Sequence, residues 1–158
     1  MADNLFLKMD IDFMKEALTE AKKAYQLGEV PVGAVVVYQG KVIARAHNQV
    51  ETQKRVMAHA ELEALAMASQ TLGRWRLNET VLYTTLEPCP MCMGAILLAR
   101  VKTLVWGAPD IRLGAGGSWV NLLEVKHPYH TLNVRSGMYE KEVGSLMRAF
   151  FKEKRASS

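Results

Sequence analysis

The order of strand-like and helix-like segments constrains the fold of this chain most strongly. Two segments rich in Val and Ile, residues 30–38 and 41–47, are separated only by Gln39 and Gly40, which is typical of a β-hairpin. Beyond the hairpin, helix-like and strand-like segments alternate. Because parallel strands need a long crossover, usually a helix, this order predicts parallel strands beside the hairpin. We therefore expect an α/β fold with a mixed sheet.

Hydrophobic periodicity and composition define the other elements. Residues 11–27 place Met14, Leu18 and other apolar side chains at three- and four-residue intervals, as an amphipathic helix does. We expect further helices at 58–72, 91–99 and 140–155, and further strands at 80–86, 102–107 and 132–135. Glycines with Pro109 and Asp110 predict a loop over residues 108–118, and residues 120–125 are ambiguous.

The composition is that of an ordinary globular chain. Of its 158 residues, 49% are hydrophobic and 23% are charged, which excludes a disordered, collagen-like or disulfide-scaffold polypeptide. Neither an internal repeat nor a linker divides the sequence. We therefore expect a single domain over residues 1–158, with its core at residues 11–155.

The formal net charge is +4, and the basic excess is local. Four cations within residues 147–158 face a single acid; they are Arg148, Lys152, Lys154 and Arg155. Such a cluster permits a polyanionic partner without requiring one. Apolar runs are too short to span a bilayer, the N-terminal segment is too acidic for a transit peptide, and the two cysteines are too close to make a useful disulfide. We expect a cytoplasmic protein without a membrane partner.

Residues suited to catalysis gather at the starts of two predicted helices. His59 and Glu61 lie in the first turn of the helix expected over 58–72, and Cys89 and Cys92 follow the strand over 80–86. The carboxyl ends of parallel strands and the N-termini of crossover helices meet at one sheet edge, so we expect these positions to converge. Each helix N-terminus also favours a thiolate over a thiol.

One imidazole and two thiolates suit zinc, and three protein ligands leave the fourth tetrahedral position for water. We therefore predict one zinc ion per chain, held by His59, Cys89 and Cys92. Bound zinc lowers the pKa of its water to about 7, which makes hydroxide available at neutral pH. Glu61, in the same turn as His59, suits a proton carrier rather than a ligand.

The same residues allow less specific interpretations. A C-x-x-C pair alone is more often a redox or structural zinc motif. A structural site needs two more ligands, and His127 and His130 are separated by two residues where zinc fingers prefer roughly three to five, so we expect both to lie in a surface loop. His47, near a strand end, is expected to be a satisfied sheet residue rather than a ligand.

His59-Ala60-Glu61, followed by Pro88-Cys89-Pro90-Met91-Cys92, resembles the signature of zinc nucleobase deaminases. Cytidine, deoxycytidylate and guanine deaminases share that signature. Further blocks are similar to the bacterial tRNA-specific adenosine deaminases: residues 29–35, Asn48, residues 85–89, and the glycine-rich residues 107–118. The resemblance extends over about residues 11–155.

The resemblance implies a three-layer, cytidine-deaminase-like fold in which helices flank a central mixed five-stranded sheet. It implies zinc-dependent hydrolytic deamination of adenosine to inosine at the wobble position of a tRNA anticodon, with a tRNA for arginine as substrate. Hydroxide held by zinc would attack adenine C6 while Glu61 moves protons. The anticodon stem-loop and a second copy of the chain would be its partners.

Two arguments predict the substrate contacts. The first is the resemblance. The second is that the wobble base lies in a single-stranded loop, so it can stack on aromatic side chains while cations bind the phosphates. The candidates are Asn48, Ala60, Asp110, Arg112, Phe150, Phe151 and Lys152. By resemblance, Asn48 and the Ala60 backbone N–H would hold the base, and Asp110 could bind a ribose hydroxyl. For Asn48 and Asp110 the alternative is turn capping. Of the two phenylalanines, we expect one to face inward and one to lie near RNA.

Two rival functions remain open from the sequence. A deaminase of free guanine or cytosine would use the same metal, and a zinc-stabilised binding module would have no turnover. The basic, aromatic C-terminal segment argues against the first, and Glu61 argues against the second. Four apolar side chains supply either a dimer surface or packing beneath the sheet; they are Met91, Met93, Ile96 and Leu97.

Overall fold

A computed structural model describes residues 8–158 and contains the predicted hairpin, in which β1 (Gly33–Tyr38) and β2 (Lys41–His47) pair antiparallel. Gln39 and Gly40 connect them, both with positive φ. β1 begins at Gly33 rather than at residue 30, because the amide of Val32 donates to the carbonyl of Val30 in a tight turn. Only glycine fits at position 33, since a Cβ there would lie 2.0 Å from a carbonyl oxygen of the first helix.

The sheet has five strands in the order β2-β1-β3-β4-β5. The remaining strands are β3 (Thr80–Leu86), β4 (Thr103–Ala108) and β5 (Asn133–Ser136). β3 runs antiparallel to β1, whereas β4 and β5 each run parallel to the preceding strand. The mixed five-stranded sheet is therefore confirmed, and the carboxyl ends of β3, β4 and β5 share one edge.

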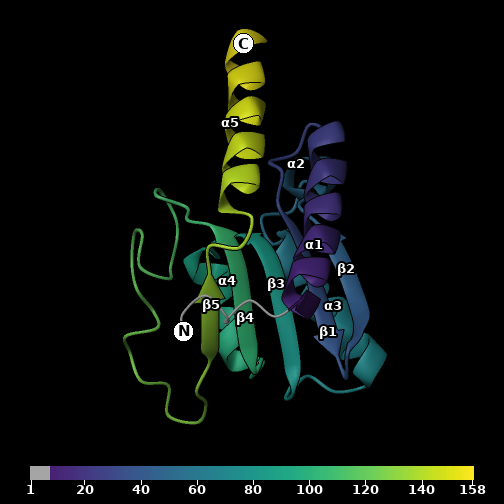
Figure 1. Ribbon diagram of the computed structural model, residues 1–158, viewed down its shortest axis with the longest axis vertical. Coiled ribbons are helices and arrows are strands. Elements are labelled where there is room, and N and C mark those ends of the chain that lie inside the picture. Colours follow the sequence, from purple (N-terminus) through teal and green to yellow (C-terminus); the bar gives the residue numbers. More distant parts are fainter. Residues whose placement is uncertain (1–7) are drawn as a thin grey trace.

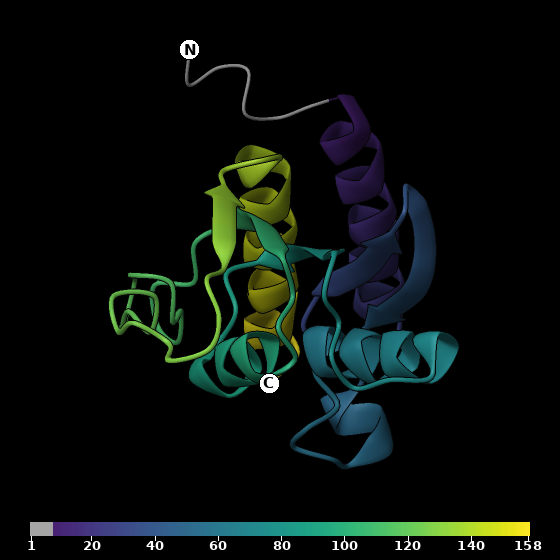
Figure 2. The same ribbon diagram turned by 90° about the horizontal axis from the view of Figure 1, so that it is seen from below.

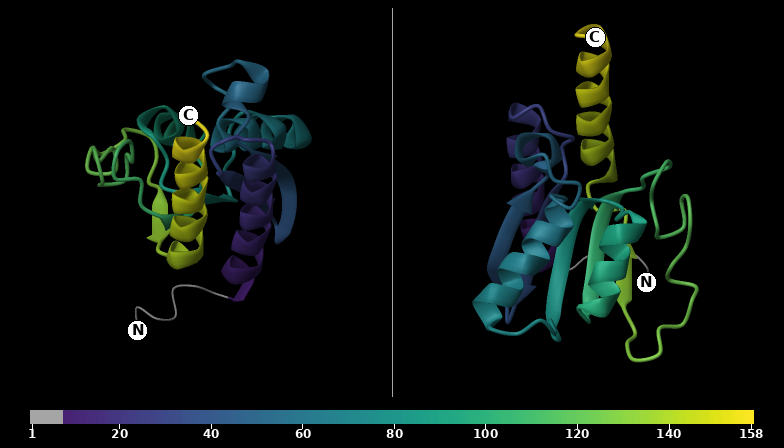
Figure 3. Two further views of the ribbon diagram at one scale, coloured as in Figure 1. Left: turned by 90° about the horizontal axis from the view of Figure 1, so that it is seen from above. Right: turned by 180° about the vertical axis from the view of Figure 1, so that it is seen from behind.

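Helices cover both faces of the sheet and give three layers (Figures 1 and 2). The long helices are α1 (Lys8–Gln26), α3 (Ala60–Leu72), α4 (Pro90–Leu98) and α5 (Glu140–Ala156). α1 and α5 lie on one face, and α3 and α4 lie on the other (Figure 3). Alternate strand residues point to the two sides: Val35 and Tyr83 pack with Met14 of α1, whereas Val36 and Leu82 face α3 and α4.

The apolar side chains of α4 divide between core and surface. Met93 and Ile96 are fully buried in the core, so these two pack beneath the sheet and contribute nothing to an outer surface. Leu97 is half-buried, and Met91 and Leu98 are exposed. Over residues 8–158, no helix is both long and apolar enough to cross a membrane.

Two further elements differ from the sequence expectation, and the segment that the sequence left ambiguous is resolved. The short helix α2 (Val50–Gln53) is an element that periodicity does not predict, and α3 begins at Ala60 instead of residue 58. Residues 120–125 form no strand, and only an isolated bridge joins Gly116 to Asn121. α5 projects past the edge of the sheet where β3 and β4 end (Figure 1).

Candidate active site

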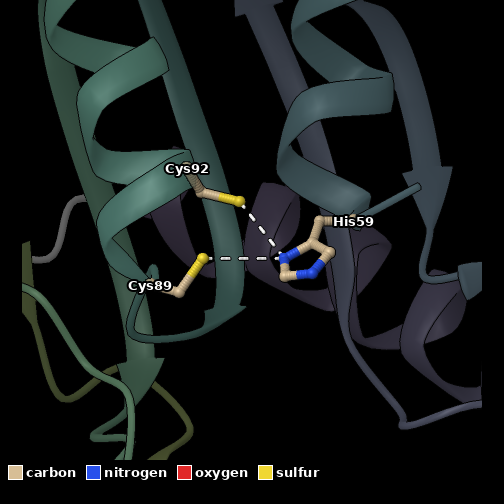
Figure 4. A group of neighbouring side chains, drawn as sticks. All are labelled: His59, Cys89 and Cys92. Atoms are coloured by element: carbon tan, nitrogen blue, oxygen red, sulfur yellow. Dashed lines mark hydrogen bonds between the residues drawn. The ribbon is translucent and has the colours of Figure 1, made fainter. Parts of the chain in front are cut away.

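The predicted metal ligands converge where α3 and α4 begin. His59 and Cys89 are the residues immediately before the two helices, and Cys92 lies in the first turn of α4. His59 therefore lies just outside the helix in which the sequence placed it. Its Nδ1 atom is 3.7 Å from Cys89 Sγ and 3.4 Å from Cys92 Sγ (Figure 4). Pro90 occupies the first turn of α4, where a missing N–H has no cost.

The spacing of these donors fits zinc. Tetrahedral zinc with typical Zn–S and Zn–N bonds places the nitrogen and each sulfur about 3.6 Å apart. The distances of 3.7 and 3.4 Å lie on either side of that value. Among residues 8–158, these three form the one group of three or more His, Cys, Asp or Glu side chains with ligand atoms this close together. The chain thus holds a His-Cys-Cys group able to bind a metal.

The two thiols differ in acidity. The hydrogen bond that Cys92 donates to Cys89 lowers the pKa of Cys89 to about 4, and the same bond together with burial raises the pKa of Cys92. The hydrogen bond with Cys89 also raises the pKa of His59. Both thiols must be deprotonated to bind zinc, so metal binding at this group releases protons.

Glu61 lies beside the ligands in the first turn of α3 and is 4% exposed. Burial raises its pKa to about 7. A carboxyl group with a pKa near neutrality can both accept and donate a proton at physiological pH, which is what a general acid or base needs. The position and the acidity of Glu61 agree with the role of proton carrier.

A cavity of about 290 Å³ opens beside the metal group, and five of the seven substrate contacts predicted from the sequence line it. Its lining includes His59, Ala60, Glu61, Cys89, Asn48, Asp110, Arg112 and Phe151. Arg112 stacks over the ring of Phe151 at 5.0 Å, so the glycine-rich loop and α5 meet at the cavity.

Two other predicted contacts lie elsewhere. Phe150 is 5% exposed and packs edge-to-face on Tyr25 of α1, which makes it the inward-facing phenylalanine and removes it from the set of substrate contacts. Lys152 is exposed and lines a groove that adjoins the cavity. Phe151 is thus the aromatic side chain of α5 that reaches the cavity.

Asn48 and Asp110 cap turns and also face the cavity. Asn48 Oδ1 accepts from the amide of Val50 at 3.3 Å, and Asp110 Oδ1 accepts from the amides of Arg112 and Leu113 at 3.2 and 3.3 Å. Both turn-capping roles are therefore present. These bonds hold the two side chains beside the cavity.

The remaining histidines have structural partners. His47 bonds to Glu20 at 3.0 Å and to Gln49 at 2.9 Å, as expected of a satisfied sheet residue. His130 is half-buried with its Nε2 atom 2.6 Å from the carbonyl of Val101, so it anchors its loop instead of lying free on the surface. His127 is also half-buried.

Comparison with known proteins agrees with this geometry. The model of the MafB19-like deaminase family matches residues 9–156. The chain is 51% identical over 143 residues to the tRNA-specific adenosine deaminase of Bacillus subtilis (strain 168), with 90% of this chain and 89% of that protein covered. The chain belongs to the tRNA-specific adenosine deaminase family. A second member, from Agrobacterium fabrum (strain C58 / ATCC 33970), is 45% identical over 90% of this chain and 94% of its own length.

Solved structures confirm the three-layer deaminase fold. One, from a study of A-to-I editing by tRNA:A34 deaminases, has a TM-score of 0.82 and 43% identity and covers 85% of this chain and 98% of its own. The guanine deaminase from Nitrosomonas europaea has a TM-score of 0.76 and 25% identity, covering 89% and 83%. The fold is thus shared between this deaminase family and a purine-base deaminase.

Two buried acids at the cavity had no role assigned from the sequence. Glu29 and Glu87 are 1% and 3% exposed, and both line the cavity. Glu29 accepts from the hydroxyl and amide of Thr52 and from the amide of Glu51, which fixes α2 beside the cavity. The sequence offered one signal for both residues, because each acid lies directly next to an apolar strand segment. A carboxylate at such a position is buried only when hydrogen-bond donors surround it.

Proposed function

We propose that this chain is a zinc-dependent hydrolase that converts adenosine to inosine at the wobble position of a tRNA anticodon, in a tRNA for arginine. The observation that carries the proposal is Glu61 beside a His-Cys-Cys group in a cavity, in a chain 51% identical to a tRNA-specific adenosine deaminase. In the reaction, the bond from adenine C6 to its amino nitrogen is broken, a bond from C6 to a water oxygen is formed, and ammonia leaves.

His59, Cys89 and Cys92 would hold one zinc ion, which when bound supplies the Lewis acidity that makes hydroxide available from water near pH 7. Glu61 would carry one proton of the attacking water to ring nitrogen N1, and would then move the second, from the new C6–OH group, to the amino nitrogen, which leaves as ammonia. Its pKa of about 7 suits both directions of transfer.

The other cavity residues bind and orient the base. The amide of Ala60 belongs to the first turn of α3, whose N–H groups have no partner within the helix, so it can donate to the base. Asn48 presents a side-chain amide whose orientation is fixed by Val30 and Val50. These donors and acceptors place C6 toward the metal group.

A groove between the 108–112 segment and α5 supports an RNA substrate over a free base. It shares Leu86, Asp110 and Phe151 with the cavity, so the two are continuous. Its cationic side chains are Arg112, Arg148, Lys152 and Arg155. Such a track can hold phosphates while the base stacks on an aromatic ring, and a free guanine or cytosine would not use it.

We also propose that the protein is a cytoplasmic homodimer. Leu98, Trp75 and Tyr129 are 66%, 56% and 75% exposed and line one hollow with the outer faces of α3 and α4. Contiguous exposed apolar surface of this kind is typical of protein interfaces. The two free thiols placed for metal binding agree with a reducing compartment.

The function is tested by offering the zinc-loaded protein an unmodified tRNA transcript, free guanine and free cytosine, and measuring inosine in the RNA and ammonia in solution. We expect inosine at the wobble position and no ammonia from either free base. Ammonia from guanine alone would replace the proposal with guanine deamination. Zinc binding without turnover of any substrate would favour a binding module.

A further inference from the structure

Glu87 follows β3 directly, and its carboxylate is enclosed by the segment 110–118, here called the 110–118 loop. Oε1 accepts from the amide of Asp110 at 3.2 Å and from the hydroxyl of Ser118 at 2.5 Å. Oε2 accepts from the amides of Gly116 and Ser118 at 2.8 and 3.2 Å. One buried carboxylate thus receives four hydrogen bonds from a single loop, which uses the full acceptor capacity of an ionised carboxyl group.

The loop backbone lies directly against this carboxylate. A Cβ at Gly114 would be 2.2 Å from Glu87 Oε2, so only glycine can occupy that position while the loop keeps its path. The amide of Ala115 also donates to the carbonyl of Pro88 at 2.8 Å. The glycine-rich sequence is therefore shaped to wrap around Glu87.

The same loop forms one wall of the cavity. Asp110, Arg112 and Leu113 line it, and Arg112 reaches across to Phe151 of α5. Glu87 holds both ends of this wall: it accepts from the amide of Asp110, where the loop begins, and from the amide of Ser118, where the loop ends. The side chain of Glu87 itself contacts loop donors rather than the metal ligands.

We propose that Glu87 is a positioning residue: its carboxylate sets the 110–118 loop so that Asp110 and Arg112 face the RNA around the target base. Glu87 acts through the loop on substrate binding, whereas Glu61 acts on the chemical step. The choice of RNA as ligand rests on the proposed function. The anchoring of the loop rests on the hydrogen bonds alone.

Glu87→Gln tests this role because glutamine keeps the volume and replaces an acceptor with a donor. Its NH₂ group then faces N–H and O–H donors, so at least one side of the loop is released. Glu79→Gln is the matched control. Glu79 precedes the same strand, its side chain is 69% exposed, and it pairs with Lys102 at the opposite end of β3.

Two measurements on zinc-loaded proteins read out the two halves of the proposal. Site-resolved hydrogen exchange of the Gly116 and Ser118 amides should accelerate about 10-fold or more in Glu87→Gln, with the amides of β4 unchanged. The KM for an anticodon stem-loop should rise about 10-fold while kcat changes less than about threefold. Ser118→Ala, which removes one bond, should show a smaller rise in KM. Glu79→Gln should match the wild type in both.

Unchanged exchange at Gly116 and Ser118 would overturn the anchoring role. Faster exchange with unchanged KM, or with a fall in kcat alone, would overturn the role in binding. If Glu87→Gln fails to fold, Ser118→Ala carries the same two readouts, and wild-type values in both would overturn the proposal. If the wild-type protein deaminates no RNA, the proposed function has failed, and the exchange rates still decide whether Glu87 anchors the loop.

Discussion

Three buried carboxylates, those of Glu29, Glu61 and Glu87, line one cavity and have different surroundings. Glu29 accepts three hydrogen bonds from α2, and Glu87 accepts four from the 110–118 loop, so each of these carboxylates holds backbone in place. Glu61 lies instead beside His59 and the thiols, and burial raises its pKa to about 7. Because the carboxyl group of Glu61 does not anchor a backbone segment in this way, it is available for proton transfer.

Glu61→Gln should separate chemistry from binding. Glutamine keeps the size of the side chain but cannot carry a proton between water and the base, so turnover should fall about 10² to 10⁴-fold. Zinc content, measured by elemental analysis, and affinity for the stem-loop should stay at wild-type values. Loss of zinc in this variant would instead make Glu61 a ligand or a folding determinant.

The sequence predicts residues that act with close neighbours and misses residues that act with distant ones. His59 and Glu61, like Cys89 and Cys92, stand within four residues of each other at helix starts, so spacing alone indicates chemistry. Glu87 meets partners more than twenty residues away, and in sequence it cannot be told from a solvated acid. Its burial becomes evident only when the 110–118 loop is folded around it.

At the scale of elements, α5 has two different faces. Glu153 accepts from Tyr25 at 2.5 Å, and Lys154 lies over Phe150, so these residues face α1. Lys152 and Arg155 line the groove beside the cavity. The basic end that the sequence treats as one cluster is therefore split between packing and the proposed RNA track.

Charge reversal on the two faces should have unequal effects. Lys152→Glu/Arg155→Glu should weaken stem-loop binding by about 10-fold or more at low salt and reduce the salt slope by about 2, because two phosphate contacts are lost. Lys154→Glu is the control and should change the slope little. Binding titrations at several salt concentrations measure the stem-loop affinity and its salt slope, and the melting temperature of each variant checks that it is folded. Equal slopes in all three proteins would place the RNA elsewhere.

The metal group joins the starts of α3 and α4, so metal removal should loosen the contact between these helices. Zinc in about 100-fold excess over its Kd adds about 3 kcal/mol of stability, which corresponds to a melting temperature about 5 to 10 °C higher. Chelation should remove this increment, and added zinc should restore it. Cys89→Ala and Cys92→Ala should lack it from the start, and a variant that kept full zinc would contradict the ligand assignment.

Long periodic elements and the sheet are predictable from the sequence, and short elements that depend on tertiary contacts are not. α1 and α5 carry clear apolar stripes, and β3 and β4 are apolar runs between helices. α2 has four residues, too few for periodicity, and it is fixed by Glu29. The start of α3 moves to Ala60 because His59 is extended, with φ −74° and ψ 144°, as a residue before a helix must be.

For the molecule as a whole, the cavity and the exposed apolar hollow use different parts of the same two helices. The cavity is lined by residues 60 and 61 at the start of α3, whereas the hollow is lined by residues 62–69 of α3, by residues 95–98 of α4 and by the adjoining Ala99. A helix of 13 residues is about 20 Å long, so a partner on the hollow can leave the cavity open. Of the two alternatives that the sequence left open for α4, packing beneath the sheet holds for Met93 and Ile96, whereas Leu98 and Trp75 supply exposed apolar surface.

A homodimer through this hollow predicts a mass of about 35 kDa by light scattering at micromolar concentration, twice the 17.7 kDa of one chain. Leu98→Glu places a charge on the lining of the hollow, where pairing would desolvate it, so this variant should scatter as a monomer. Because Leu98 is 66% exposed, the variant should keep its zinc and its melting temperature at low protein concentration. Val56→Glu is the matched control, since Val56 is 74% exposed outside the hollow, and it should remain dimeric. A monomeric wild-type protein would exclude the dimer, and a dimeric Leu98→Glu variant would place its interface on another face.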